Sequence, residues 1–191
     1  MPDGDFLDDR RRASEDDYFR RKDKELIERM RQAAAAEQAR NQLSAKTGLN
    51  DPALVKELEA LGFSPDTISV LPLVPIVQMA WAEGGITQAE RTLLMEVARE
   101  RGIAAGSAAD RLLADWMARE PSPEVFTRAT RLIRAMLDSG APDSAPMSVD
   151  DLIKYSERIA EASGGILGIG RISSEERATL AKIAAELKGR T

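Results

Sequence analysis

Paired residues that start helices recur along the chain, and they constrain its fold more than any other sequence feature. In each pair a Thr or Ser precedes an acidic residue by three positions, so that hydroxyl and carboxylate can satisfy each other's backbone amides in a helix's first turn. These pairs are Thr87 with Glu90, Ser107 with Asp110, Ser148 with Asp151, and Ser173 with Glu176. The spacing predicts four helix starts.

Proline and glycine mark further helix starts and ends. Asp51 before Pro52 and Ser122 before Pro123 are typical of an N-cap followed by a first helical residue. Glycines placed to end helices are Gly62, Gly102, Gly140 and Gly189. With apolar residues at helical spacing and no run that alternates with period two, we expect an all-α domain of about seven helices from residue 50.

Two segments of this domain are predicted to be a core helix and a linker. The most apolar stretch, residues 68–82, is too short to span a membrane and predicts a buried core helix, with Pro72 and Pro75 in its first turn. Residues 140–147 contain two prolines and predict the one longer linker.

Residues 1–47 differ from the rest in charge. They carry 11 basic and 11 acidic residues, so the net charge of −5 belongs to residues 48–191 and a boundary is expected near Gly48. Ser14 is placed to cap a helix, and no Gly or Pro interrupts residues 15–43. The segment predicts a long charged helix of coiled-coil type, an arm that precedes the domain.

The apolar face of this arm is thin. It consists of Tyr18, Phe19, Leu26, Ile27 and Met30, and beyond them only alanines occur before Leu43. So little apolar surface does not hold down a long helix. The arm is therefore either solvated and partly mobile, or a helix that docks on a partner through Tyr18, Phe19, Arg20, Leu26, Ile27 and Met30.

Composition excludes several classes of function. The chain has no cysteine and no histidine, which removes disulfides, Cys/His zinc sites and Ser/His or Cys/His catalysis. With 27 basic against 32 acidic residues, nucleic-acid binding is not expected. No basic start followed by an apolar run and no membrane span is found, so we expect a cytoplasmic protein.

Two stretches of the domain read alike, at residues 72–101 and 148–188. The shared positions are Ala80, Gly84, Gly85, Thr87, Glu90 and Leu94 in the first, and Ala160, Gly164, Gly165, Ser173, Glu176 and Leu180 in the second. The second copy carries extra residues between its glycines and its cap, at 166–171. We interpret this as an internal duplication of a helix, glycine turn, helix unit.

The segment from Ala80 to Glu90 resembles the signature of the tellurite-resistance TerB family, which also occurs in the amino-terminal domain of DjlA-type co-chaperones. The resemblance covers about residues 50–188 and implies a TerB-like helical domain with two similar halves. It also implies a link to metal, tellurite or envelope stress, with metal binding and membrane-associated protein partners. The sequence departs from the family at its acidic position, where Glu83 replaces the usual aspartate and Ser163 replaces it in the second copy.

We expect no cofactor; the alternative is a divalent metal, for which Glu83, Glu90 and Glu176 are the candidate ligands. Glu90 and Glu176 also have a simpler interpretation, because each closes a capping box. A hard cation such as Ca²⁺ needs six to eight oxygens, more than two carboxylates supply. An enzyme using Glu83, Glu90 or Asp110 is a further alternative, but no spacing fixes a catalytic geometry and we expect no enzyme.

A second resemblance lies in the arm. Residues 10–31, with Tyr18, Phe19 and Arg20 at their centre, are similar to the inhibitory helix of the mitochondrial ATP synthase inhibitor proteins. The pH-sensing histidine region of that family has no counterpart here. The similarity implies a regulator that inhibits a rotary ATPase.

Three functions follow from these features. The first is a non-enzymatic protein-interaction module of the TerB-like type, with the arm as an extra docking helix. The alternatives are a rotary-ATPase inhibitor that acts through the arm and a divalent-metal sensor that acts through the glutamates.

Overall fold

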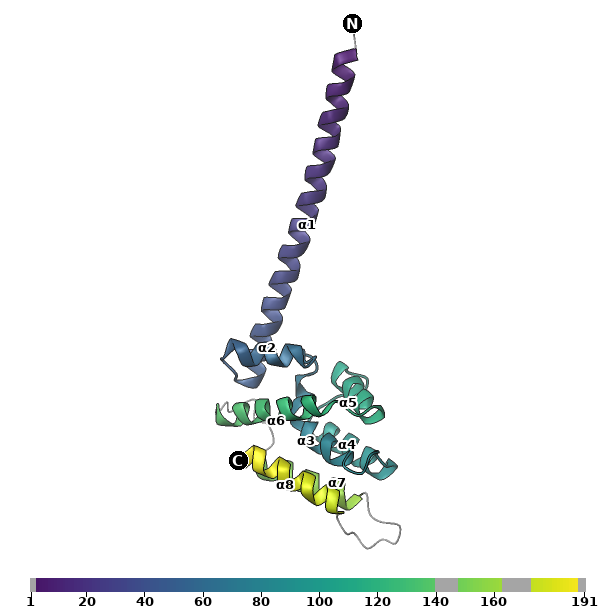
Figure 1. Ribbon diagram of the computed structural model, residues 1–191, viewed down its shortest axis with the longest axis vertical. Coiled ribbons are helices and arrows are strands. Elements are labelled where there is room, and N and C mark those ends of the chain that lie inside the picture. Colours follow the sequence, from purple (N-terminus) through teal and green to yellow (C-terminus); the bar gives the residue numbers. More distant parts are fainter. Residues whose placement is uncertain (1–2, 140–147, 163–172, 189–191) are drawn as a thin grey trace. The chain divides into compact units, whose positions relative to one another are not determined.

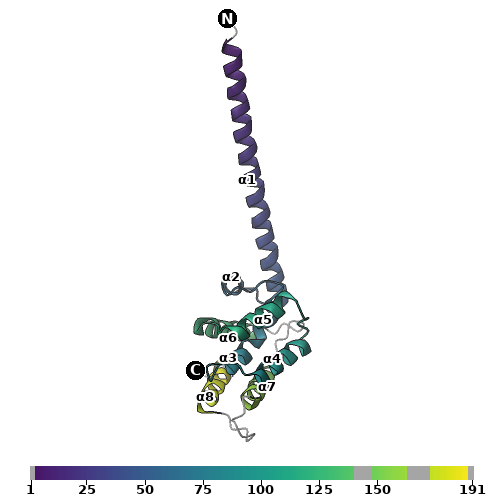
Figure 2. The same ribbon diagram turned by 90° about the vertical axis from the view of Figure 1, so that its right-hand side faces the viewer.

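The structure is a computed structural model that describes residues 3–139, 148–162 and 173–188, with side chains from Asp17 onward except at Val149 and Ala160. These residues form helices and no strand, which confirms the all-α prediction (Figures 1 and 2). The chain divides into two compact units, Met1–Asn41 and Gln42–Thr191. The second unit thus begins shortly before the boundary expected near Gly48.

The first unit is a single helix. Helix α1 spans Asp3–Thr47, so its final turns already belong to the second unit. The long helix is confirmed, but the prediction that Ser14 caps it is wrong, because α1 begins well before that residue. No proline occurs between Asp3 and Thr47, and a serine inside a helix costs only a few tenths of a kcal/mol relative to alanine. Gly48, at φ 71°, follows the last turn.

The second unit contains seven α-helices and one 3₁₀-helix within its described residues. They are α2 (Pro52–Ala60), η1 (Ile68–Leu73), α3 (Val74–Ala80), α4 (Gln88–Glu100), α5 (Ala108–Ala118), α6 (Pro123–Asp138), α7 (Val149–Ala162) and α8 (Ser174–Lys188). This agrees with the expected number of helices from residue 50. Helix α3 packs on α4, α6, α7 and α8, and it occupies the middle of the unit (Figure 1).

The expectation of one core helix over residues 68–82 is half right. The segment is buried, but it splits into η1 and α3 at Leu73 and Val74. Pro72 lies inside η1, where it has no N–H to donate, and the tighter 3₁₀ turn accommodates it. Pro75 lies in the first turn of α3, as predicted.

Most of the predicted helix starts and stops are confirmed. Asp51 accepts the Ala53 amide at 2.8 Å, and Ser107 and Ser148 accept the amides of Asp110 and Asp151 at 3.1 Å each. Ser122 lies at the N-cap of α6, but its side chain makes no capping hydrogen bond. Gly62 and Gly102 follow their helices at φ 84° and 78°. Gly140, Gly189 and the linker expected at 140–147 lie outside the described residues.

The core of the second unit is aliphatic. Its largest fully buried side chains are Leu43, Leu58, Leu71, Leu73, Ile76, Met79, Leu94, Leu113, Leu132, Ile133 and Leu152. Trp81 and Trp116 pack against this core while remaining partly exposed. The indole Nε1 of Trp81 donates to the Trp116 carbonyl at 2.9 Å, which ties the end of α3 to the last turn of α5.

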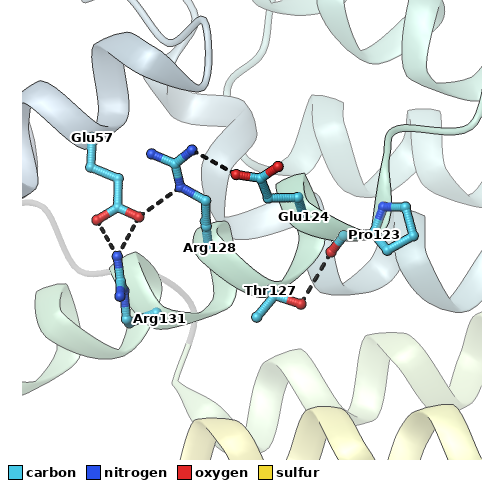
Figure 3. Close-up of polar contacts among 6 residues, drawn as sticks. All are labelled: Glu57, Pro123, Glu124, Thr127, Arg128 and Arg131. Carbon is cyan, nitrogen blue, oxygen red and sulfur yellow. Dashed lines mark hydrogen bonds and ion pairs between the residues drawn. The ribbon is translucent and has the colours of Figure 1, made fainter.

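An ion cluster fastens α2 to α6 (Figure 3). The Glu57 carboxylate accepts hydrogen bonds from Arg128 Nε at 2.9 Å and from Arg131, while Arg128 also donates to Glu124 at 3.1 Å. Burial raises the pKa of Glu57, but the hydrogen bonds and charges of Arg131 and Arg128 outweigh it and leave the pKa below its usual value. The carboxylate is therefore held in its charged form.

Candidate functional site

Helix α1 exposes an apolar stripe. Its large apolar side chains are 49–64% exposed, and we call them the arm stripe: Tyr18, Phe19, Leu26, Ile27 and Met30. They are the large hydrophobic side chains exposed to this degree among the residues whose side chains are described. An exposed run of this kind, on one short stretch of helix, is typical of an interaction surface.

The spacing of the arm stripe places most of it on one face. Phe19, Leu26 and Met30 stand at i, i+7 and i+11, which an α-helix brings to one side, and Tyr18 and Ile27 lie at its edges. The rings of Tyr18 and Phe19 meet edge to face, with centroids 5.8 Å apart. The anchors are therefore arranged as in a helix that lies in a groove.

Arg20, the remaining predicted docking residue, stands seven positions before Ile27 and so lies along the same edge of this face. Its guanidinium is 3.7 Å from Asp17, and both side chains are exposed. Other charged residues next to the stripe are Lys22, Asp23 and Arg29, which together with Leu26 and Glu25 line a hollow on the surface of α1. The sequence pattern had not singled out Lys22 or Arg29, although their spacing from Leu26 carried the signal.

Glu90 and Glu176 form closed capping boxes, as their spacing predicted. The Thr87 amide donates to Glu90 Oε2 at 2.6 Å, and the Glu90 amide donates to Thr87 Oγ1 at 3.2 Å. The second box repeats this geometry, with the Ser173 amide 2.7 Å from Glu176 Oε2 and the Glu176 amide 3.1 Å from Ser173 Oγ. Both glutamates are buried, at 2% and 1% exposure.

The charge of Glu176 in the second box acts on Glu90 in the first. Burial raises the pKa of Glu90, the Thr87 hydrogen bonds oppose this rise, and the negative charges of Glu176 and Glu83 add to it, so that the pKa is raised overall. Two of the predicted metal ligands, Glu83 and Glu176, thus lie within electrostatic reach of the third, Glu90. Among the described residues, however, no group of three or more acidic side chains is arranged to hold a metal ion.

Asp110, the other carboxylate considered for chemistry, fastens a turn. It accepts the Gly106 amide at 2.8 Å and pairs with Arg99 at 2.6 Å. The Gly106 hydrogen bond first, and then the hydrogen bond and charge of Arg99, hold the pKa of this carboxyl below its usual value. These contacts join α4 to the start of α5.

The duplication remains a prediction. The two capping boxes are alike, but the loop of the second copy, at 163–172, lies outside the described residues, as does Ser163. What the sequence pattern missed are the long-range contacts, such as the Glu57 cluster and Arg91, which donates to the Met117 carbonyl at 3.0 Å. Their partners lie far apart in sequence and leave no local signal.

Comparison with protein-family models, with curated proteins and with solved structures found no match to this chain. Within the described residues, no helix combines the length and the apolar character that crossing a membrane requires.

Proposed function

We propose that this protein is a non-enzymatic protein-interaction module, acting in the cytoplasm, in which α1 docks on another protein through the arm stripe. The observation that carries the proposal is the exposure of five large apolar side chains on one short stretch of helix. Burying one such side chain fully is worth about 1.5–3 kcal/mol, so the half-exposed anchors can together supply several kcal/mol of binding energy.

The second unit would be a TerB-like domain in this proposal. Support comes from the resemblance of residues 80–90 to the family signature and from the similar capping boxes at Thr87 and Ser173. A link to metal, tellurite or envelope stress, with a membrane-associated complex as the partner, belongs to this proposal and rests on the resemblance.

Affinity capture from lysate and solubilised membranes of the native source tests the docking. The full chain is compared with the Phe19→Ala/Leu26→Ala variant and with Arg21→Ala/Lys24→Ala, a matched control on the opposite side of α1. Helix content measured by circular dichroism should be the same in all three proteins. We expect the stripe variant to lose the retained partners and the control to keep them. Partners kept by both variants would refute docking through the stripe.

Inhibition of a rotary ATPase is the second candidate, favoured by the exposure of Tyr18 and Phe19 at the centre of the resembling segment. A peptide of residues 10–31 should slow ATP hydrolysis by a purified rotary ATPase, and Phe19→Ala should weaken the effect. Because the chain lacks histidine, the inhibition should not switch at histidine's pKa. An inert peptide would eliminate this candidate.

Divalent-metal sensing is the third candidate. It is favoured by the repulsion that Glu176 and Glu83 exert on Glu90, which a bound cation would relieve. Calorimetric titration with Ca²⁺, Mg²⁺ and Mn²⁺ should then show binding and a rise in melting temperature, both reduced by Glu90→Gln. A titration with neither heat nor thermal shift would remove the candidate.

A further inference from the structure

We infer, on the basis of the proposed docking function, that the partner offers an apolar groove whose border is acidic where it faces Lys22 and Arg29, and that a second copy of this chain is not the partner. The charges that flank the arm stripe specify the chemistry of the surface that receives it.

Lys22 and Arg29 form a basic border along one side of the stripe. They are seven residues apart, which is two helical turns or about 10 Å, and Leu26 is a helical neighbour of both. The hollow beside Leu26 is lined by both cations and also by Asp23 and Glu25. A surface that covers Leu26 therefore meets these two cations on one side of it and Asp23 on the other.

Lys22 makes two contacts within α1, with Glu25 and with the face of the Tyr18 ring at 5.8 Å, and neither neutralises this border. Its ammonium lies 3.3 Å from Glu25, but both side chains are more than half exposed. An exposed pair of this kind contributes little to stability, so a carboxylate on a partner competes with it readily. Two acidic side chains about 10 Å apart on the partner would complement the border.

A second copy of the chain fits this surface poorly in either orientation. In a parallel pair with the stripe as its seam, the Asp23 side chains of both copies would meet between the layers of Phe19 and Leu26. In an antiparallel pair, two-fold symmetry would set the Lys22 and Arg29 border against itself. Both arrangements juxtapose like charges, which destabilises an interface.

The length of the stripe also argues against self-pairing. Its apolar side chains span residues 18–30, about two heptads, whereas a coiled coil is expected from a pattern sustained over at least three or four. Glu37 stands one heptad beyond Met30, where a longer seam would need an apolar residue. A short helix in a complementary groove is the arrangement that remains.

Photo-crosslinking with the full chain tests the partner's chemistry. A photoreactive benzophenone residue replaces Ala33, which is exposed and continues the line of Leu26 without removing an anchor. The labelled protein is irradiated in native-source extract, and the crosslinked peptide is sequenced by mass spectrometry. Three variants are compared with the parent: Lys22→Glu/Arg29→Glu, the control Arg21→Glu/Lys24→Glu with the same change of charge, and Phe19→Ala/Leu26→Ala.

We expect the border reversal to lower the crosslink yield about tenfold and the control to change it less than about twofold. The crosslinked peptide should be apolar with acidic side chains, and raising the salt concentration should lower the yield. Equal losses in the two charge variants, no loss on border reversal, a basic peptide, or crosslinks between copies of this chain would overturn the inference. Crosslinks that do not depend on Phe19 and Leu26, or none at all, would instead refute the docking function and this inference with it.

Discussion

Helices α1 and α6 carry similar apolar patterns but use them differently. In α6, Phe126, Leu132 and Met136 recur at helical spacing and are at most 4% exposed. In α1, Phe19 and Met30 recur in the same way and are more than 60% exposed. Periodicity therefore identifies a helix and its apolar face, but it does not show whether the chain itself covers that face.

The difference separates two roles. The second unit uses its apolar residues for its own core and so supplies the folding stability of the chain. The first unit is held by local interactions, such as the hydrogen bond of 3.1 Å from Gln32 to Glu28. None of its described apolar side chains belongs to that core, and its large ones are exposed.

Truncation should have the largest effect on stability, and it tests whether the second unit alone supplies that stability. A chain that starts at Gln42 should keep the unfolding free energy of the full chain within about 1 kcal/mol, because the residues removed lie outside the second unit. A chain that starts at Asn50 also loses the buried Leu43 and Leu49, and should be less stable by roughly 5 kcal/mol or more. Urea unfolding followed by the fluorescence of Trp81 and Trp116 measures both. Equal losses in the two chains would show that the arm also stabilises the fold.

How far the sequence predicted this structure depends on the range of each interaction. The capping pairs were predictable because hydroxyl, carboxylate and amides lie within three residues, as at Thr87 and Glu90. The cluster that joins Glu57 to Arg128 was not, because its partners come together only when α2 packs on α6. Local chemistry sets helix starts, whereas helix packing decides which charges meet.

The same distinction explains the errors within elements. The predicted start of α1 at Ser14 is wrong because a capping residue is only a preference: serine is tolerated inside a helix, and no proline lies between Asp3 and Ser14 to stop it. The break between η1 and α3 follows from Pro72, whose effect on a buried segment depends on its neighbours. For the candidate site, the composition of the arm stripe was predictable, but its exposure required the structure.

The next largest effect on stability is expected from matched leucine substitutions in α6 and α1. Leu132→Ala empties a fully buried position of α6 and should lower the unfolding free energy by about 3 kcal/mol. Leu26→Ala makes the same chemical change on the exposed face of α1 and should cost less than about 0.5 kcal/mol. Urea unfolding of both variants checks this. A large loss in Leu26→Ala would mean that something in the folded protein covers the stripe.

A smaller effect is expected at the cluster between α2 and α6. Glu57→Ala leaves Arg128 and Arg131 without their shared carboxylate and should cost about 1–2 kcal/mol, since both arginines are partly solvated. Glu124→Ala removes a carboxylate that is exposed and also pairs with Arg128, and should cost less than about 0.5 kcal/mol. Similar losses would show that the ion pairs of Glu57 stabilise the fold no more than the exposed pair of Glu124.

The pH dependence of this cluster follows from the lowered pKa of Glu57. Burial raises that pKa, but Arg131 and Arg128 outweigh it, so the folded value lies below the unfolded value of about 4.3. The stabilisation is therefore complete above about pH 5 and is lost as the pH falls through the folded pKa. The difference in stability between the parent and Glu57→Ala should shrink below about pH 4. A difference independent of pH would rule out the charge as its source.

The substitution Glu90→Gln should give the smallest effect, with the opposite sign. Burial, and then the charges of Glu176 and Glu83, raise the pKa of Glu90 in the fold in spite of the Thr87 hydrogen bonds. Because the folded pKa lies above the unfolded value, the ionised carboxylate weakens the fold at neutral pH, and stability is regained as the pH falls through the folded pKa. Glu90→Gln keeps an oxygen for the Thr87 amide and should stabilise the protein by up to about 0.5 kcal/mol at pH 7, a gain that disappears below about pH 4.

Glu90→Ala separates the charge of Glu90 from its capping role. It removes the acceptor of the Thr87 amide and should cost about 1 kcal/mol at pH 7, because that amide loses its partner in the first turn of α4. If Glu90→Gln were as destabilising as Glu90→Ala, the negative charge itself would be stabilising, and a cation beside Glu83 and Glu176 would be the simplest source. Repeating the unfolding with Ca²⁺ or Mn²⁺ present shows whether a cation binds there. A bound cation raises the stability of the parent and leaves that of Glu90→Gln unchanged.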